Sequence, residues 1–182
     1  DIVSGAWWYE GPEFRRKHPI GEVQAVGEYY DDFGEIPLDI NGDGRLDFVT
    51  GGWWGNTIRW RENPGDGERQ WPEHVIARTG NVEAVCGWDV DRDGQAEIVP
   101  NTPGGPLVVY KIRTDADGKP TGEFDSHRIF NEPQGHGLGF GDISGNGRVD
   151  FVLARGWLEA PEDPFQGEWI LHPEFDLGSA SV

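Results

Sequence analysis

The sequence predicts an all-β protein built from a repeated four-stranded unit, and three observations support that fold class. Glycine (28 residues) and proline (13 residues) are frequent, which favours turns and short strands over long helices. No segment shows sustained helical periodicity. The segment that begins at Asp1 recurs in similar form at Asp47, Glu97 and Asp150, so the sequence repeats with a period of about 50 residues.

Each complete period contains four stretches rich in β-branched and aromatic residues, separated by Gly, Pro, Asn and Asp. The expected strands are 35–40, 46–52, 57–62 and 74–78 in one period, and 83–90, 96–101, 107–113 and 124–130 in the next. Four short antiparallel strands in a repeat of this length are typical of a β-propeller blade.

The repeats divide the chain into about three and a half blades. The expected blade units are 1–30 (partial), 31–80, 81–131 and 132–182 (partial). The first unit begins at its second strand, and we expect the last one to end after its third. Closed propellers have about 4–8 blades, so we expect the remainder of a longer protein or a second copy of the chain to complete the ring.

The composition limits the classes of partner. The net charge is −18 and the pI is near 4.4, so the surface repels nucleic acid and anionic membranes and favours cations. No apolar run is long enough to span a bilayer. The single cysteine, Cys86, cannot form an intrachain disulfide and is interpreted as a small buried residue.

Three acidic loops precede the repeated strands: "DINGDGRLD", "DVDRDGQAE" and "DISGNGRVD". Oxygen-bearing side chains stand at positions 1, 3, 5 and 9, glycine permits a sharp turn at position 6, and position 7 offers a backbone carbonyl. Ca²⁺ prefers six to eight such oxygen ligands. The candidate metal ligands are Asp39, Asn41, Asp43, Arg45 and Asp47, then Asp89, Asp91, Asp93, Gln95 and Glu97, then Asp142, Ser144, Asn146, Arg148 and Asp150.

The loops differ in carboxylate content: the 89–97 loop has four, the 39–47 loop three and the 142–150 loop two. Since ligand charge raises calcium affinity, we expect the 142–150 loop to bind most weakly. The alternative is a hairpin turn without metal, because Asp-Gly and Asn-Gly are strong turn dipeptides. Turn chemistry explains positions 5 and 6, but it does not explain positions 1, 3 and 9.

These loops, each followed by a strand of the form [DE]-[FI]-V, resemble the FG-GAP/VCBS repeats of integrin-type β-propellers. The resemblance implies calcium between the first two strands of each blade and a seven-bladed ring. A second feature, "W-x-E-N-P…W-x-x-H-x-I" between Trp60 and Ile76, is similar to a bacterial group of such propellers. More weakly, the chain resembles the propeller domains of aldos-2-ulose dehydratase, and no catalytic residue is transferred from them.

Two sets of residues are candidates for a ligand or active site. His136 and Glu83 each stand six positions before the first Asp of an acidic loop, at the expected channel mouth, where they can act as acid and base or be ordinary polar residues at the start of a strand. The pairs Trp7-Trp8 and Trp53-Trp54 recur in the repeat, and such recurrence favours a role in packing between blades. Neighbouring residues of a strand face opposite ways, so one tryptophan of each pair can pack while the other is available to a ligand. Trp8 and Trp54 are therefore candidates for stacking on a sugar ring.

His74 and His127 share one position on the fourth strand, which indicates a structural role. Two functions stay open. One is a calcium-binding module for extracellular or periplasmic binding or scaffolding, with carbohydrate as its ligand. The other is the propeller part of a carbohydrate-active lyase or dehydratase, with its site around His136 and Glu83. The sequence does not decide whether the protein is an enzyme.

Overall fold

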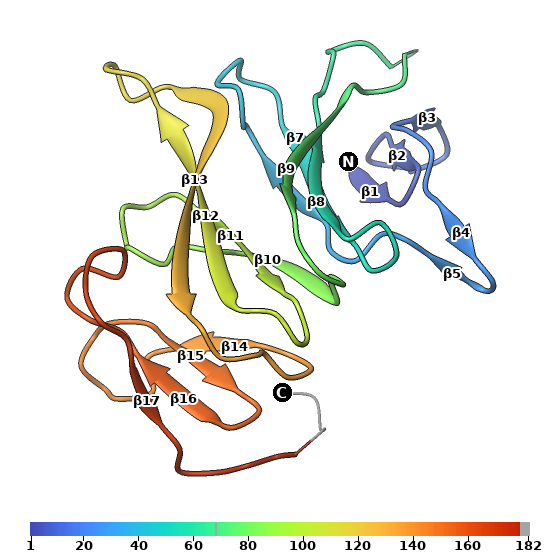
Figure 1. Ribbon diagram of the computed structural model, residues 1–182. Coiled ribbons are helices and arrows are strands. Elements are labelled where there is room, and N and C mark those ends of the chain that lie inside the picture. The colour runs from blue at the N-terminus through green and yellow to red at the C-terminus, as the bar shows by residue number, and fades with distance from the viewer. Residues whose placement is uncertain (68, 179–182) are drawn as a thin grey trace.

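The computed structural model describes residues 1–67 and 69–178, and these residues form β-strands and no helix. Within them, seventeen strands make five antiparallel sheets (Figure 1). The first sheet contains β1 (Ile2–Ser4), β2 (Trp7–Tyr9) and β3 (Lys17–Pro19). A separate hairpin follows, made of β4 (Ala25–Val26) and β5 (Tyr29–Tyr30).

Three four-stranded sheets make up the rest of the fold. The second sheet contains β6 (Ile36–Leu38), β7 (Asp47–Gly52), β8 (Thr57–Arg61) and β9 (Glu73–Arg78). The third contains β10 (Ala84–Trp88), β11 (Glu97–Asn101), β12 (Leu107–Thr114) and β13 (Pro120–Phe130). The fourth contains β14 (Gly139–Gly141), β15 (Asp150–Leu153), β16 (Gly156–Glu159) and β17 (Ile170–His172).

In every sheet each strand pairs with the next one along the chain, and the sheets follow one another along an arc (Figure 1). This is the topology of propeller blades, so the prediction of a partial β-propeller is confirmed. All eight strands predicted for the second and third sheets are present. The fourth sheet corrects one expectation: it has a complete fourth strand, β17, where we expected the chain to end after the third.

Hydrophobic residues fill the space between neighbouring sheets. Ile58 and Trp60 of the second sheet share a buried cluster with Ile98 and Tyr110 of the third. A second cluster joins the third sheet to the fourth, and a third cluster joins the first sheet to the second. The core is therefore a series of interfaces between blades rather than a single centre.

A close approach at Gly51 explains the small residues at the end of β7. A Cβ atom on Gly51 would lie 2.4 Å from Val82 Cγ1 and 2.6 Å from Val85 Cγ2, so only glycine fits beside the entry to the third sheet. The neighbouring strand β10 lies against β6 and β7. Cys86 on β10 is half-buried rather than fully buried as expected, and its partial burial raises the pKa of its thiol.

The two Trp-Trp pairs, which look equivalent in the sequence, occupy different places. A two-residue turn joins β1 to β2, so Trp7 and Trp8 lie on the third strand of their blade. In the second sheet, Trp53 and Trp54 lie in the longer turn between β7 and β8. The counterpart of Trp8 is Trp60, because both stand opposite a histidine of the fourth strand. The expected equivalence of the pairs is therefore wrong.

The β12–β13 hairpin is the longest of the fold, and Figure 1 shows its tip projecting beyond the other strands of its sheet. Beyond the pairing with β12, the Gly122 amide donates a hydrogen bond to the Ile40 carbonyl (2.9 Å). A Cβ atom on Gly42 would lie 2.7 Å from the side chain of Lys119. The hairpin of the third sheet thus lies against the 39–47 loop of the second.

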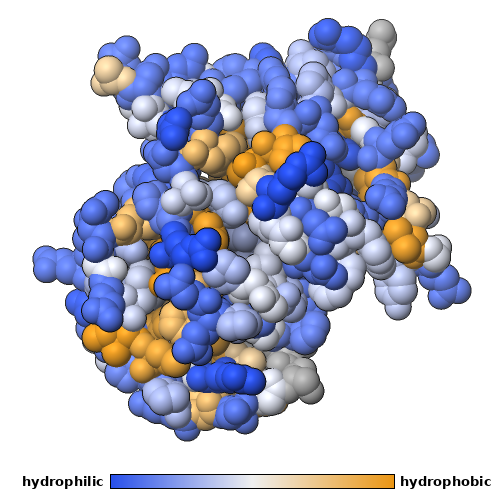
Figure 2. All heavy atoms as spheres, in the orientation of Figure 1, coloured by the Kyte–Doolittle hydropathy of each residue, from blue (hydrophilic) through white to orange (hydrophobic). Residues whose placement is uncertain are grey.

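On the face seen in Figure 2, hydrophilic residues predominate and hydrophobic residues gather in a few separate patches. The high acidic content of the chain accounts for this surface. Across the described residues, no helix is long and apolar enough to cross a membrane.

Candidate functional site

The three acidic loops share a buried carboxylate at their ninth position. These residues are Asp47, Glu97 and Asp150, and each is at most 1% exposed. One oxygen of each accepts a hydrogen bond from the amide of the second loop residue. The donors are Ile40 N (2.9 Å), Val90 N (2.7 Å) and Ile143 N (2.9 Å). Each loop is therefore closed by a carboxylate that holds the backbone.

Positions 1 and 5 also hold the turn. The first residue accepts from the amide of the glycine at position 6, as in Asp39 with Gly44 (2.9 Å), Asp89 with Gly94 (3.1 Å) and Asp142 with Gly147 (2.9 Å). The fifth residue accepts from the amide at position 7, namely that of Arg45 (2.9 Å), Gln95 (2.8 Å) or Arg148 (2.8 Å). Carboxylate oxygens keep further lone pairs after one such bond, so the turn and a cation are compatible.

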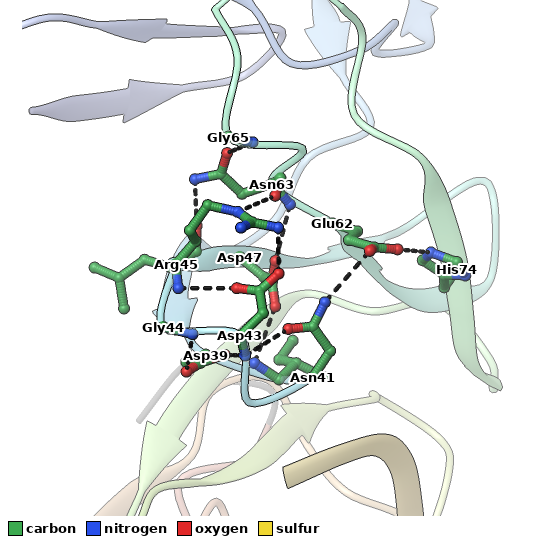
Figure 3. A network of polar contacts seen from close by, with 12 residues as sticks. Asp39, Asn41, Asp43, Gly44, Arg45, Asp47, Glu62, Asn63, Gly65 and His74 are labelled. Atoms are coloured by element: carbon green, nitrogen blue, oxygen red, sulfur yellow. Dashed lines mark hydrogen bonds and ion pairs between the residues drawn. The ribbon is translucent and has the colours of Figure 1, made fainter.

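In the 39–47 loop, groups from the next strands join the network (Figure 3). Asp39 Oδ1 and Asn41 Oδ1 both accept from the Asp43 amide, at 3.0 and 3.1 Å, so these two oxygens converge. The Asn41 amide group donates to Glu62 Oε1 (3.3 Å). Burial raises the pKa of the Asp47 carboxyl, and the negative charges of Asp43 and Asp39 add to the rise.

The 89–97 loop holds the densest group of carboxylates. Ligand oxygens of Asp89, Asp91 and Glu97 lie within 4.8 Å of one another. The ammonium of Lys111 on β12 lies among them, and Asp89 Oδ1 is buried without a hydrogen-bond partner in the described part of the chain. Burial lowers the pKa of Lys111, but the hydrogen bonds that its ammonium donates to Asp91, Asp93 and Glu97 outweigh this effect and raise the pKa above its usual range.

In the 142–150 loop, Asp150 binds the amides of three residues, including Ser144 (3.0 Å) and Ala160 (2.9 Å). Asn146 donates to Glu159 Oε1 (3.2 Å), much as Asn41 donates to Glu62. Two carboxylates and two neutral oxygens make this the least charged loop.

The donor set decides how well each loop fits Ca²⁺. The 39–47 loop fits, because it presents converging carboxylate and amide oxygens and its own cation, Arg45, pairs with Asp43 at the outer end of the loop and not with Asp39 or Asp47. The 142–150 loop offers the same types of donor with less charge. The 89–97 loop does not fit as it stands, since an internal ammonium contacts the same carboxylates. This differs from the expectation that charge alone ranks the loops.

The structure brings the two candidate catalytic residues together. His136 Nδ1 lies 2.8 Å from Glu83 Oε1, and both side chains are partly exposed. The Gly137 amide donates to Glu83 Oε2 (3.3 Å) and to Asn101 Oδ1 (2.9 Å). Because Glu83 precedes β10 and His136 precedes β14, the pair links the entries of two neighbouring blades. An imidazole held by a carboxylate is suited to acid–base chemistry and equally to joining blades.

Three further acidic residues, Asp31, Asp32 and Glu35, accept hydrogen bonds from groups of the first two sheets. Asp31 accepts from the backbone amides of Trp54 and Gly55 (both 2.9 Å), which fixes the β7–β8 turn. Glu35 accepts from the Gly5 amide (3.1 Å). Asp32 accepts from the Thr50 hydroxyl, and burial raises the pKa of its carboxyl.

Trp54, a candidate ligand-binding residue, belongs to an aromatic group beside the β4–β5 hairpin. Its ring lies 6.0 Å from that of Tyr29 and 5.9 Å from that of Phe33. Tyr29 and Tyr30 are about two-thirds exposed, at 66% and 67%. This group is an accessible aromatic surface of the kind that stacks on sugar rings.

A repeated arrangement of Trp, His and Glu was not predicted from the sequence. In each case a histidine of the fourth strand stacks on a tryptophan of the third strand. The same histidine contacts the glutamate that follows this tryptophan by two residues. The sets are Trp8, His18 and Glu10; Trp60, His74 and Glu62; and Trp157, His172 and Glu159. The signal was present as W-x-E followed by His, but only the strand register shows that the three copies match.

The third sheet departs from this arrangement. His127 stands opposite Val109, which offers no ring, and stacks instead on Phe165 at 4.0 Å. The position of the glutamate is taken by Lys111. In this sheet the fourth-strand histidine therefore packs on a phenylalanine from the fourth blade unit instead of on a tryptophan of its own sheet.

A cleft lies at the junction of the first two sheets, with a volume of about 950 Å³. Its walls include the side chains of Trp8, His18 and Trp71 and several carboxylates, among them Asp1 and Glu10. The indole N–H groups of Trp8 and Trp71 are buried and have no hydrogen-bond partner among the described residues. Aromatic and polar groups lining a cavity of this size are typical of a small-ligand site.

Comparisons with known proteins support the repeat. Residues 39–100 match the family model of the FG-GAP-like repeat, the family that the loop pattern resembles. No curated protein matches the chain significantly. One similar solved structure concerns the specific recognition of non-reducing terminal N-acetylglucosamine by an Agrocybe aegerita lectin. It is 21% identical, with a TM-score of 0.47, and the alignment covers 80% of this chain but only 39% of that one.

Proposed function

We propose that the protein is a calcium-binding β-propeller module that binds carbohydrate outside the cytoplasm, in an extracellular or periplasmic setting. The observation that carries the binding role is the cleft between the first two sheets. Its aromatic walls match the apolar faces of a sugar ring, and its carboxylates can accept hydrogen bonds from sugar hydroxyls. A hydroxyl that entered between the sheets would also meet the indole N–H groups of Trp8 and Trp71.

Calcium is proposed for the 39–47 and 142–150 loops, whose oxygens suit a hard cation. Extracellular modules bind this ion with dissociation constants of about 10⁻⁴–10⁻³ M, which matches loops with few carboxylates. Calorimetric titration of calcium into chelator-treated protein tests the proposal, with Asp39→Ala as the variant. We expect that substitution to remove one bound ion. A wild-type melting temperature that does not rise with calcium would contradict the proposal.

A glycan array followed by titration of tryptophan fluorescence tests the carbohydrate role. We expect Trp8→Ala to weaken binding at the cleft, and Trp54→Ala to weaken it only if the aromatic group of Tyr29 and Phe33 is a second contact. Absence of any glycan that binds in the presence of calcium would reject the role. Light scattering tests whether a second copy completes the ring, since the sheets of the described residues follow an open arc (Figure 1).

The 2.8 Å contact of His136 with Glu83 favours one alternative, a sugar lyase or dehydratase with its site at the entries of the third and fourth sheets. Product analysis on any glycan that binds distinguishes the two functions. Turnover that is lost in His136→Gln supports the enzyme, and binding without turnover supports the module.

A further inference from the structure

One position, on the third strand or directly after its last residue, carries charges of opposite sign in different blades. It lies two residues after the residue that faces the fourth-strand histidine. The second and fourth sheets have Glu62 and Glu159 there, and the third sheet has Lys111. Strand register makes these residues structural equivalents, although the sequences around them differ.

The Lys111 side chain reaches the 89–97 loop and contacts three of its carboxylates. Its Nζ lies 2.6 Å from Asp91 Oδ2, 2.6 Å from Asp93 Oδ2 and 3.1 Å from Glu97 Oε1. An ammonium has three hydrogens, and three acceptors surround it. The acceptors are loop positions 3, 5 and 9, which are three of the positions that the sequence assigns to a metal ion.

The glutamates make different contacts. Glu62 binds the position-3 residue Asn41, and Glu159 binds the position-5 residue Asn146, so each brings a negative charge to its loop. In these loops, the second oxygen of the ninth residue accepts a backbone amide: Asn63 N at 2.8 Å or Ala160 N at 2.9 Å. In the 89–97 loop, the Lys111 ammonium takes that place on Glu97.

We propose that Lys111 is the built-in cation of the 89–97 loop, so that this loop forms without a divalent metal, and that the third-strand residue selects which loops take calcium. Like charges repel strongly at short range, so a calcium ion would have to displace the ammonium. The atom it would gain is Asp89 Oδ1, which is buried and lacks a hydrogen-bond partner in the described residues. The part concerning calcium rests on the proposed function, but the role of Lys111 does not.

Calcium titration by calorimetry, on chelator-treated protein, tests the selection. We expect Asp91→Asn to leave the number of bound ions unchanged and Lys111→Glu to add one. The reciprocal change, Glu62→Lys, should remove one. Loss of an ion from Asp91→Asn, or no gain in Lys111→Glu, overturns the inference.

Thermal unfolding in excess chelator tests Lys111 even if no loop binds calcium. We expect Lys111→Gln to lower the melting temperature by about 3–6 °C, and Lys17→Gln, which removes the same charge from the first sheet, to lower it far less. Equal effects of the two substitutions overturn the inference. Lys111→Arg keeps the positive charge and decides the matter if Lys111→Gln does not fold: a folded Arg variant with near wild-type stability supports the proposal, and an unfolded one counts against it.

Discussion

The imidazole of His74 stacks on the indole of Trp60, with ring centroids 4.5 Å apart and the ring planes 24° apart. The two residues face each other across β8 and β9, and Glu62 Oε2 lies 3.0 Å from His74 Nε2. Trp60 is buried against the third sheet, so the stack covers the outer part of an interface between blades. The same arrangement recurs in the first and fourth sheets, which marks it as a structural element of the repeat.

Trp60→Ala should lower the free energy of unfolding by about 3–5 kcal/mol, because it removes a large buried ring from the interface between two sheets. Trp53→Ala, in the β7–β8 turn, should cost much less. Urea denaturation of both variants measures the difference. Similar losses for the two substitutions would show that Trp60 has no special place in the interface.

Asp47→Asn should destabilise the protein by about 1–3 kcal/mol even in the presence of chelator. Both Asp47 oxygens accept backbone amides, from Ile40 and Asn63, and the asparagine NH₂ cannot replace one of them. Asp43→Asn, at a more exposed position, is the matched control. If Asp47→Asn destabilises only when calcium is present, the carboxylate serves the metal rather than the backbone.

Asp32→Asn should raise the melting temperature at pH 7 and lose that advantage as the pH falls. Burial raises the pKa of Asp32 above its ordinary value of 3.8, an effect that Thr50, Arg59 and Arg61 oppose and Asp31 reinforces. Stability linked to a raised carboxyl pKa is fully present below the unfolded-state pKa and is lost as the pH rises through the folded-state pKa. As the pH rises through the range from the unfolded-state to the folded-state pKa of Asp32, the wild type therefore loses stability and the variant does not.

Melting curves of wild type and Asp32→Asn between pH 3 and pH 7 test the expected direction of this difference in stability. The difference at pH 7 should be about 1–3 °C in favour of the variant. A variant that is less stable than the wild type at pH 7 would show that the attraction of Arg59 and Arg61 outweighs burial.

Gly156→Ala should destabilise strongly, while Gly141→Ala should be nearly neutral. Gly156 has a φ of +110°, and a Cβ atom there would lie 2.1 Å from the His172 carbonyl oxygen on the paired strand. Gly141, in the same sheet, has ordinary backbone angles and no atom within 4 Å of that position. Differential scanning calorimetry of both variants gives the comparison, and equal melting temperatures would argue against the β16–β17 pairing described here.

The local parts of the fold were predictable from the sequence. Alternation such as "TIRW" marks strands, and the Asp-Gly and Asn-Gly loops mark the turns, because both signals depend on residues close in the chain. Contacts that depend on register were not predictable. Lys111 lies 20 residues from Asp91 in the sequence, and irregular pairing at both ends of β12 hides its register.

The Trp pairs show the same limit in another way. "SGAWW" and "TGGWW" look alike, yet the length of the turn places one pair on a strand and the other in a loop. The fourth strand of the last blade was not predicted for a similar reason, since β17 has only three residues and a weak sequence pattern. The length of a turn and the residue at which a strand ends depend on packing against the neighbouring sheet. The sequence of one repeat does not contain this information.

The contact of Gly122 with Ile40 gives the acidic loop a second attachment. The Ile40 amide donates to Asp47 inside its own loop, while the Ile40 carbonyl accepts from a strand of the next blade. The amide of Ile40 is thus held within its own blade, and the carbonyl of the same residue is held by the neighbouring blade. Movement of this loop away from β13 would break the Gly122–Ile40 hydrogen bond, so the loop that precedes β7 is part of the interface between the second and third sheets.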